Sequence, residues 1–135
     1  LIYGTELSVA ADLNVFELSG SYAHTEALDD TNEPNRRGNQ LPGRPKDSGY
    51  LRTALDFDEF FIYADARGVA GIYLNAANTK MVDPYLIFGS GVGVKRKSWR
   101  VQLDVQNVFD QQAFDIRGMP LTGRAVYLTV GYRGF

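Results

Sequence analysis

The fold is decided by the segment Ala125-Val126-Tyr127-Leu128-Thr129-Val130-Gly131-Tyr132-Arg133-Gly134-Phe135. Val126, Leu128, Val130 and Tyr132 fall on one face of an extended strand, and polar or small residues alternate with them on the other face. The last residues of soluble proteins are mostly frayed and polar. A strictly alternating strand that ends on the aromatic residue Phe135 is typical of the strand that closes a membrane β-barrel.

The composition narrows the class of protein. The 135 residues suit one domain, and the mean hydropathy of −0.23 argues against a helical membrane protein. No run reaches the roughly 18 to 20 apolar residues that a transmembrane helix needs. The 14 glycines and the 16 Tyr and Phe residues are typical of β-barrel strands with aromatic girdles. The lack of cysteine excludes disulfide bonds. The net charge of −2 gives no electrostatic basis for nucleic-acid binding.

The same alternation recurs along the rest of the chain. It predicts seven strands, at residues 3–11, 15–25, 48–57, 60–69, 85–94, 98–106 and 125–135. The connections between them alternate short and long: short turns at 12–14, 58–59 and 95–97, and long loops at 26–40, 71–83 and 107–123. This asymmetry is typical of outer-membrane barrels, which have short periplasmic turns and long extracellular loops. We therefore expect an all-β, antiparallel transmembrane sheet whose last strand runs toward the periplasm.

The polar faces of these strands carry charges of both signs at mid-strand positions. Either a solvated outer surface or a water-filled lumen accepts such charges, so a small soluble barrel with apolar residues inside stays an alternative. The opposite faces mix small residues with Leu and Val and gather aromatics near strand ends, which favours contact with lipid. The best candidates for lumen-facing polar residues, serving mainly as a lattice of cross-strand charge pairs, are Arg52, Asp56, Arg67, Arg100 and Asp104.

Four motifs resemble one family in their order and spacing. They are Tyr3-Gly4-Thr5-Glu6-Leu7, Gly38-Asn39-Gln40-Leu41-Pro42-Gly43-Arg44-Pro45, Val105-Gln106-Asn107-Val108-Phe109-Asp110 and Gly118-Met119-Pro120-Leu121-Thr122-Gly123-Arg124. The set resembles the C-terminal end of TonB-dependent outer-membrane receptors. The family usually ends in the pattern aromatic-x-Phe, whereas Phe135 here is out of phase with Tyr132 by one residue. Two explanations stay open: a bulge at Gly134 restores its direction, or Phe135 lies beyond the last hydrogen bond of the strand pair.

The resemblance implies a place within a larger molecule. Members of the family are barrels of about 22 strands with an N-terminal plug, so residues 1–135 are expected to be the C-terminal portion of the barrel, with the plug and the N-terminal strands absent. Seven strands alone would leave two open edges in lipid. We therefore expect a piece of a longer polypeptide or one subunit of a split barrel.

The resemblance also implies a function without covalent chemistry or cofactor. Expected is an active transporter for a scarce ligand such as an iron chelate, cobalamin, a metal or a glycan. Expected partners are outer-membrane lipid, the remaining strands, the plug and the periplasmic TonB protein, with no nucleic acid. Two alternatives stay open: a structural subunit that completes another chain's wall, and a soluble carrier of an apolar ligand.

Single residues add three expectations. Tyr73, Phe114 and Met119 lie on predicted outer loops and are candidates for ligand contact. His24, the only histidine, has no ligand-like spacing around it and is expected at the interface or in a loop. The glycines of the Gly89-Ser90-Gly91-Val92-Gly93 segment are expected to make room for a neighbouring aromatic or for the plug.

Overall fold

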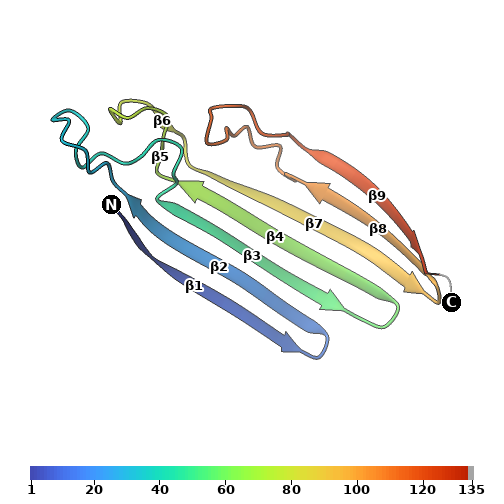
Figure 1. Cartoon of the computed structure of the whole chain (residues 1–135). Helices are drawn as coiled ribbons and strands as arrows, with labels where there is room; N and C mark the ends of the chain where they lie inside the picture. Colours follow the sequence, from blue (N-terminus) through green and yellow to red (C-terminus); the bar gives the residue numbers. More distant parts are fainter. Residues whose placement is uncertain (134–135) are drawn as a thin grey trace.

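The computed structural model describes residues 1–133 and is a single-layer antiparallel sheet of seven strands (Figure 1). The sheet is made of β1 (Ile2–Leu13), β2 (Phe16–Ala27), β3 (Asp47–Asp56), β4 (Phe60–Ala70), β7 (Tyr85–Arg96), β8 (Trp99–Gln106) and β9 (Ala125–Tyr132), each paired with the next. The predicted all-β fold class and the seven main strands are confirmed. No helix among the described residues is long and apolar enough to cross a membrane.

The connections segregate to opposite ends of the sheet. Figure 1 shows the three long connections together at one end and the three short turns at the other, because each strand reverses the direction of the one before it. The N-terminus lies at the long-loop end, and β9 runs toward the short-turn end. This is the arrangement predicted from the alternating loop lengths.

Two of the short turns lie further along the chain than the sequence predicted. Asp12 pairs with Glu17 and Leu13 with Phe16, so β1 continues through the predicted turn at 12–14 and the chain reverses at Asn14, whose φ is 66°. Similarly, Lys95 and Arg96 belong to β7, and the turn follows at Lys97, whose φ is 52°. The predicted basic turn at 95–97 was therefore wrong in position.

The second long loop contains structure that the alternation did not predict. β5 (Ile72–Tyr73) and β6 (Met81–Val82) form a separate two-stranded sheet. Tyr73 therefore lies in a short strand at the long-loop end and not in irregular coil. Phe135 and the proposed bulge at Gly134 lie outside the described residues.

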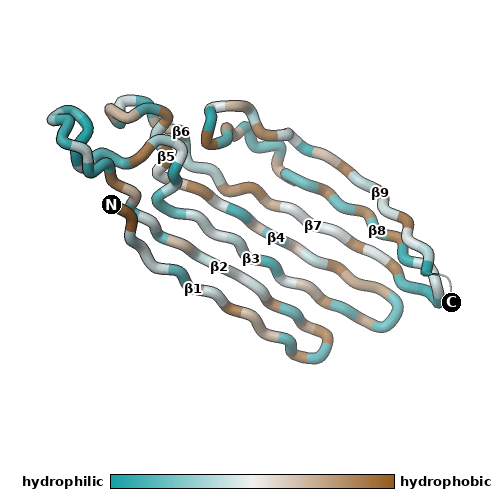
Figure 2. Tube along the Cα trace, viewed as in Figure 1, coloured by the Kyte–Doolittle hydropathy of each residue, from teal (hydrophilic) through white to brown (hydrophobic). Residues whose placement is uncertain are grey.

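The two faces of the main sheet differ in character. Hydrophobic and hydrophilic residues alternate along most of the sheet (Figure 2), apart from hydrophobic runs at Phe60-Phe61-Ile62 of β4 and Leu86-Ile87-Phe88 of β7. The register gathers most apolar side chains on one face and the charged ones on the other. The apolar face carries Leu103 between Val92 and Leu128, and it is uncovered: Leu7 and Leu128 are 69% and 68% exposed. Val126, Leu128, Val130 and Tyr132 all lie on this face of β9. A soluble barrel with its apolar residues inside would instead bury these side chains.

Candidate functional site

The centre of the polar face is built by glycines of β7 and side chains of β4. Gly89, Gly91 and Gly93 are the cross-strand partners of Asp65, Tyr63 and Phe61. A Cβ on residue 91 would lie 2.6 Å from Cζ of Tyr63, and one on residue 89 would lie 2.8 Å from Oδ1 of Asp65. A side chain at residue 91 would require the ring of Tyr63 to move, whereas the carboxylate of Asp65 could turn away from one at residue 89. The expectation that the glycines accommodate a neighbouring aromatic is confirmed for Gly91 and Gly93, which face Tyr63 and Phe61, but not for Gly89, which faces Asp65.

Tyr63 is the hub of a polar network that crosses four strands. Its hydroxyl donates to Oδ1 of Asp104 on β8, and the guanidinium carbon of Arg52 on β3 lies 3.6 Å from its ring centroid. Nε2 of Gln102 also donates to Oδ1 of Asp104, at 2.6 Å. Two kinds of contact stabilise the folded sheet here, where water is partly excluded. One is the pair of hydrogen bonds to the carboxylate, and the other is the stacking of the guanidinium on the tyrosine ring. Arg52 and Asp104 are thus joined through one ring.

A second group lies nearer the short-turn end of the same face. Arg100 stacks over the ring of Phe61 at 4.3 Å and donates to Oε1 of Gln102 at 3.1 Å, while Lys95 forms an ion pair with Asp56. Phe61 is only 4% exposed, although it lies on the polar face. The ring is covered by the stem and head of a cationic side chain, as expected for arginine.

Four of the five predicted polar residues therefore have partners within the sheet. These are Arg52, Asp56, Arg100 and Asp104; Arg67 lies on the same face, between its cross-strand partners Tyr50 and Ile87. Four further residues of this face take part in the contacts but were not predicted to do so: Tyr63, Phe61, Gln102 and Lys95. All four occupy the same alternate positions of their strands as the predicted residues. The alternation of side chains within each strand would have been enough to predict that they lie on the polar face.

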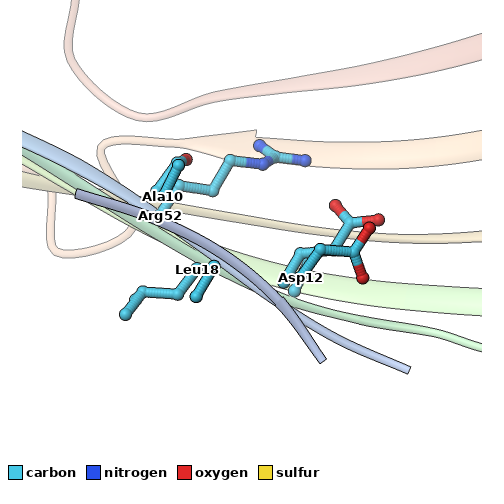
Figure 3. Close-up of a pocket in the computed structure, with 8 residues that line it drawn as sticks. Ala10, Asp12, Leu18 and Arg52 are labelled. Carbon is cyan, nitrogen blue, oxygen red and sulfur yellow. The ribbon is translucent and has the colours of Figure 1, made fainter. Parts of the chain in front are cut away.

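Near the first short turn the polar face is acidic. Asp12 of β1 and Glu17 of β2 are direct cross-strand partners, and like charges in that position repel. They line a shallow depression of about 410 Å³ with Arg52, whose side chain extends from the same side of the sheet as Asp12, whereas Leu18 points to the other side (Figure 3).

The first two long loops are joined by a reciprocal pair of hydrogen bonds. The backbone N–H of Gln40 donates to Oδ1 of Asn78 at 2.7 Å, and Nδ2 of Asn78 donates to the carbonyl of Gln40 at 2.8 Å. Nδ2 of Asn39 also donates to the carbonyl of Ala76 at 2.9 Å, and the N–H of Gly43 donates to the carbonyl of Tyr73 at 2.8 Å. An asparagine amide has one acceptor and a donor group, like a peptide unit, so it can form the same pair of hydrogen bonds as a neighbouring β-strand. These bonds hold the two loops together.

Several residues of these loops are buried. Ile72 and its strand partner Val82 are 2% and 5% exposed, and Ala27 and Gln40 are 1% and 2% exposed. Oε1 of Gln40 accepts from the N–H of Ala27 at 3.3 Å, so the buried amide is hydrogen-bonded. The first two loops are therefore joined to each other. We call the three long connections at this end of the sheet, residues 28–46, 71–84 and 107–124, the loop platform.

The third loop is clamped at its base by the Asn107-Val108-Phe109-Asp110 motif. Asn107 is 3% exposed and uses its amide three times, accepting from the N–H of Gln111 and donating to the carbonyls of Gln111 and Thr122. Oδ1 of Asp110 accepts from the N–H of Arg124 at 2.7 Å. Both residues have positive φ, which asparagine and aspartate tolerate best after glycine. The motif thus ties the start of the loop to its end.

The tip of the third loop is organised around Asp115. Its Oδ1 accepts from the N–H groups of Met119 and Arg117, each at 2.8 Å, and these bonds hold the pKa of its carboxyl below the usual range. The tip lies beside the second loop, because a Cβ on Gly118 would be 3.3 Å from Cδ1 of Leu74. Phe114 and Met119 are exposed on this tip, and Tyr73 is on β5, one residue from Leu74.

On the apolar face, a polar rim lies at the long-loop end. Asp47 Oδ1 accepts from the hydroxyl of Tyr22 at 2.6 Å and lies 2.8 Å from Nδ1 of His24, and Nζ of Lys46 lies 2.8 Å from Oε1 of Glu26. His24 is in β2, paired with Thr5 of β1 and Asp47 of β3, so it is a strand residue near the long-loop end of the sheet. Among residues 1–133, no group of three or more His, Asp and Glu side chains is arranged to hold a metal ion.

Comparison with protein families gives one match, to a model described as "TonB dependent receptor-like, beta-barrel", over residues 1–108. No curated protein sequence matches the chain.

Solved structures resemble the whole sheet. The siderophore receptor PiuA from Acinetobacter baumannii aligns with a TM-score of 0.85 at 22% identity, covering 97% of this chain and 21% of that receptor. BauA, the ferric preacinetobactin receptor of the same organism, gives 0.86 at 19%, covering 97% and 22%. Fiu, the ferric-catecholate import receptor of E. coli K12, gives 0.80 at 22%, covering 97% and 20%. The chain thus spans about a fifth of each neighbour's length and shares its fold over that part.

Proposed function

The chain belongs to the TonB-dependent receptor β-barrel family, and from that premise we propose that it forms part of the wall of an active transporter. Proteins of this family are receptors and transporters of the Gram-negative outer membrane, in which a barrel encloses a plug and works with TonB and a ligand. The chain is therefore an outer-membrane β-barrel protein.

We assign the polar face to the lumen and the apolar face to the lipid. The apolar face is exposed across the sheet, whereas Phe61 and Ile87 on the polar face are nearly buried. A surface that contacts hydrocarbon needs no covering layer, and charged side chains are costly there. In this arrangement the five predicted polar residues face the lumen: Arg52, Asp56, Arg67, Arg100 and Asp104. All of them except Arg67 belong to a lattice of side-chain contacts that fixes the shape of the barrel wall.

We place the chain, residues 1–135, as the C-terminal portion of the barrel. Within the described residues, β1 and β9 each pair on one side only, and backbone groups in lipid need partners. The remaining strands of the barrel supply those partners, and the plug and the periplasmic TonB protein complete the transporter. No covalent step on the ligand is part of this role.

The ligand we propose is an iron chelate, bound first at the loop platform. Three of the structural neighbours are a siderophore receptor, a ferric preacinetobactin receptor and a ferric-catecholate import receptor, and another is a copper transporter, OprC. The observation that carries the proposal is the joining of the loops through Asn78, Gln40, Tyr73 and Gly43, because a preorganised surface loses less entropy on binding. Tyr73, Phe114 and Met119 are the candidate contacts on it.

The test is binding and uptake by the intact protein. Replacing residues 74–80 by two glycines removes the tip of the second loop, and we expect loss of saturable ferric-siderophore binding, measured by quenching of intrinsic fluorescence. Uptake of iron-55 chelates by cells should require TonB. The matched control replaces the short turn at Lys97 and Ser98 by Asn-Gly, which leaves the loop platform unchanged and should leave binding unchanged. Binding that survives loss of the loop tip would exclude the platform, and uptake without TonB would exclude the transport role.

A triple variant tests the candidate contact residues. Tyr73→Ala, Phe114→Ala and Met119→Ala together are expected to weaken ferric-siderophore binding at least about tenfold, since an anchor side chain contributes more than about 1 kcal/mol. Val15→Ala, an exposed apolar residue in a turn at the other end of the sheet, is the control. An unchanged affinity in the triple variant would remove these three residues from the binding site.

A further inference from the structure

The three long loops are not held to one another equally. Hydrogen bonds join the first loop to the second from tip to base. Near the tip, Gln40 and Asn78 exchange two hydrogen bonds. At the base, the N–H of Lys46 donates to the carbonyls of Ala70 and Gly71, at 3.1 and 3.3 Å. Because several bonds must break together before these two loops separate, we expect them to move as one unit.

The third loop is held mainly by bonds within itself. Asn107 and Asp110 close its base, and Asp115 closes its tip. Between base and tip, the N–H of Leu121 donates to the carbonyl of Ala113 at 2.8 Å. These bonds connect the two arms of the loop, so the loop keeps its shape if it moves.

Between these two units the structure has packing contacts without hydrogen bonds. Within residues 1–133, no hydrogen bond or ion pair joins the third loop to the first or the second. A Cβ on Gly118 would lie 3.3 Å from Cδ1 of Leu74, and a Cβ on Gly43 would lie 3.6 Å from the carbonyl oxygen of Ile116. We call this boundary the loop seam. A boundary without directional bonds opens at a lower cost than a hydrogen-bonded one.

The loop seam continues into the sheet between β7 and β8. β7 pairs with β4 from Tyr85 onward but with β8 only from Ser90 onward. Along residues 85–89, the third loop makes one backbone hydrogen bond to β7, from the N–H of Val108 to the carbonyl of Phe88 at 2.9 Å. β8 itself is paired with β9 along its whole length. The third loop is therefore firmly attached to the β8–β9 hairpin and weakly to β7, which is the arrangement of a hinged element.

We propose that the third loop is a lid on the loop platform. It moves as one body relative to the joined first two loops, about a hinge where β8 separates from β7, and the loop seam opens when it moves. The candidate ligand contacts lie on both sides of the loop seam, with Tyr73 on one side and Phe114 and Met119 on the other. A ligand that contacts both sides favours the closed position, because its contacts supply what the loop seam lacks. The movement is a property of this fold, whereas its effect on the ligand rests on the proposed function.

Pulsed electron paramagnetic resonance of the intact protein tests the movement without a ligand. The chain has no cysteine, so spin labels can be placed at chosen positions. Arg37→Cys with Gln112→Cys reports across the loop seam, and Arg37→Cys with Lys80→Cys reports within the joined loops; all three side chains are exposed. The distance distribution of the first pair should be at least about twofold broader than that of the second. A saturating iron(III) tris-catecholate chelate should narrow the first distribution and leave the second unchanged.

A cross-link tests whether the movement admits the ligand. Lys80 and Arg117 lie on opposite sides of the loop seam, because the carbonyl of Lys80 accepts from the N–H of Leu74 and Arg117 precedes Gly118. Lys80→Cys and Arg117→Cys are joined by a short bismaleimide reagent. Joining them should slow association of an iron-55 tris-catecholate chelate at least about tenfold relative to the same variant before joining, as for a lid held shut.

The matched control places the same cross-link within the joined loops. The carbonyls of Asn35 and Ala76 both accept from Nδ2 of Asn39, at 3.2 and 2.9 Å, so these residues are neighbours across the first and second loops. Joining Asn35→Cys to Ala76→Cys should leave the association rate of the variant unchanged, because these loops already move together. Heat-modifiable migration in gels shows that each variant has folded.

Three results would overturn the proposal. The first is a distance distribution across the loop seam as narrow as the one within the joined loops. The second is a broad distribution within the joined loops, which would mean that they are not one unit. The third is an unchanged association rate after the loop seam is cross-linked, which would show that the movement does not admit the ligand. If the distances behave as expected but the unlinked protein binds no iron chelate, the movement is supported and the proposed function fails.

Discussion

The ring of Tyr63 on β4 occupies the space in front of Gly91 on β7, so that a Cβ on residue 91 would lie 2.6 Å from Cζ of the ring. Gly91→Ala is therefore expected to destabilise the sheet by about 1–3 kcal/mol, the usual cost of overpacking. The measurement is the free energy of unfolding of the intact protein in lipid, from urea titration. Gly49→Ala is the matched control, because its Cβ would meet nothing closer than 3.6 Å, and a change within about 0.5 kcal/mol is expected.

A double-mutant cycle tests the physical cause of that effect. In the Tyr63→Ala background the ring is gone, and the added cost of Gly91→Ala should be smaller than in the wild type. An equal cost in both backgrounds would mean that the glycine is required for a reason other than space for the ring.

The second prediction concerns the clamp at the base of the third loop. Asn107→Ala removes three hydrogen bonds from a buried position and should cost about 1–3 kcal/mol for the unsatisfied partners. Since φ of residue 107 is 50°, Asn107→Gly should be less damaging than Asn107→Ala, by about 1 kcal/mol. Urea unfolding measures both.

Gln112→Ala is the control for the clamp, because Gln112 is exposed in the same loop. Hydrogen exchange of residues 111–124 should rise in the two Asn107 variants and not in Gln112→Ala. Unchanged exchange in Asn107→Ala would show that the motif does not hold the loop.

The strands could be predicted because their information is local. Each of β1 to β4 and β7 to β9 alternates over eight or more residues, and that period is incompatible with a helix. Their ends could not be predicted, because pairing decides them: Lys95 looks like a turn residue, yet its N–H bonds to the carbonyl of Glu59 and its side chain pairs with Asp56 across the sheet. From sequence alone a charged residue is expected in an exposed turn. On the polar face of this sheet, however, a charged residue can lie within a strand.

The loop platform was the part that sequence reasoning did not foresee. β5 and β6 have two residues each, too few to show a period. The bonds between Gln40 and Asn78 join residues 38 positions apart, and no local pattern indicates such a contact. The Asn107 motif was recognised by resemblance only; its role as a clamp became visible once Thr122 and Arg124 were placed beside it.

The third prediction tests the junction between the first two loops. Asn78→Ala should uncouple them, because the reciprocal bonds to Gln40 are lost. We expect faster hydrogen exchange at residues 39–43 and also at 73–80, by roughly tenfold or more, since two hydrogen bonds at about 1 kcal/mol each are removed. Asn32→Ala, an exposed asparagine in the first loop, is the control. Faster exchange confined to residues 73–80 would show that the loops are independent.

The last prediction uses acid to open the tip of the third loop. Two backbone N–H donors, from Met119 and Arg117, favour the ionised form of Asp115, so its pKa in the folded protein is lower than the value of about 3.9 in an unfolded chain. A depressed pKa means that the turn is stabilised above the unfolded value and loses that stability as the pH falls through the folded value. The carboxyl carbon of Asp115 in the selectively labelled intact protein should titrate below about 3.9, with Asp115→Asn identifying the signal. In the same variant the turn should persist without this pH dependence, because the amide oxygen still accepts both bonds. A titration midpoint at or above the unfolded value would show that the two N–H groups do not hold the carboxylate.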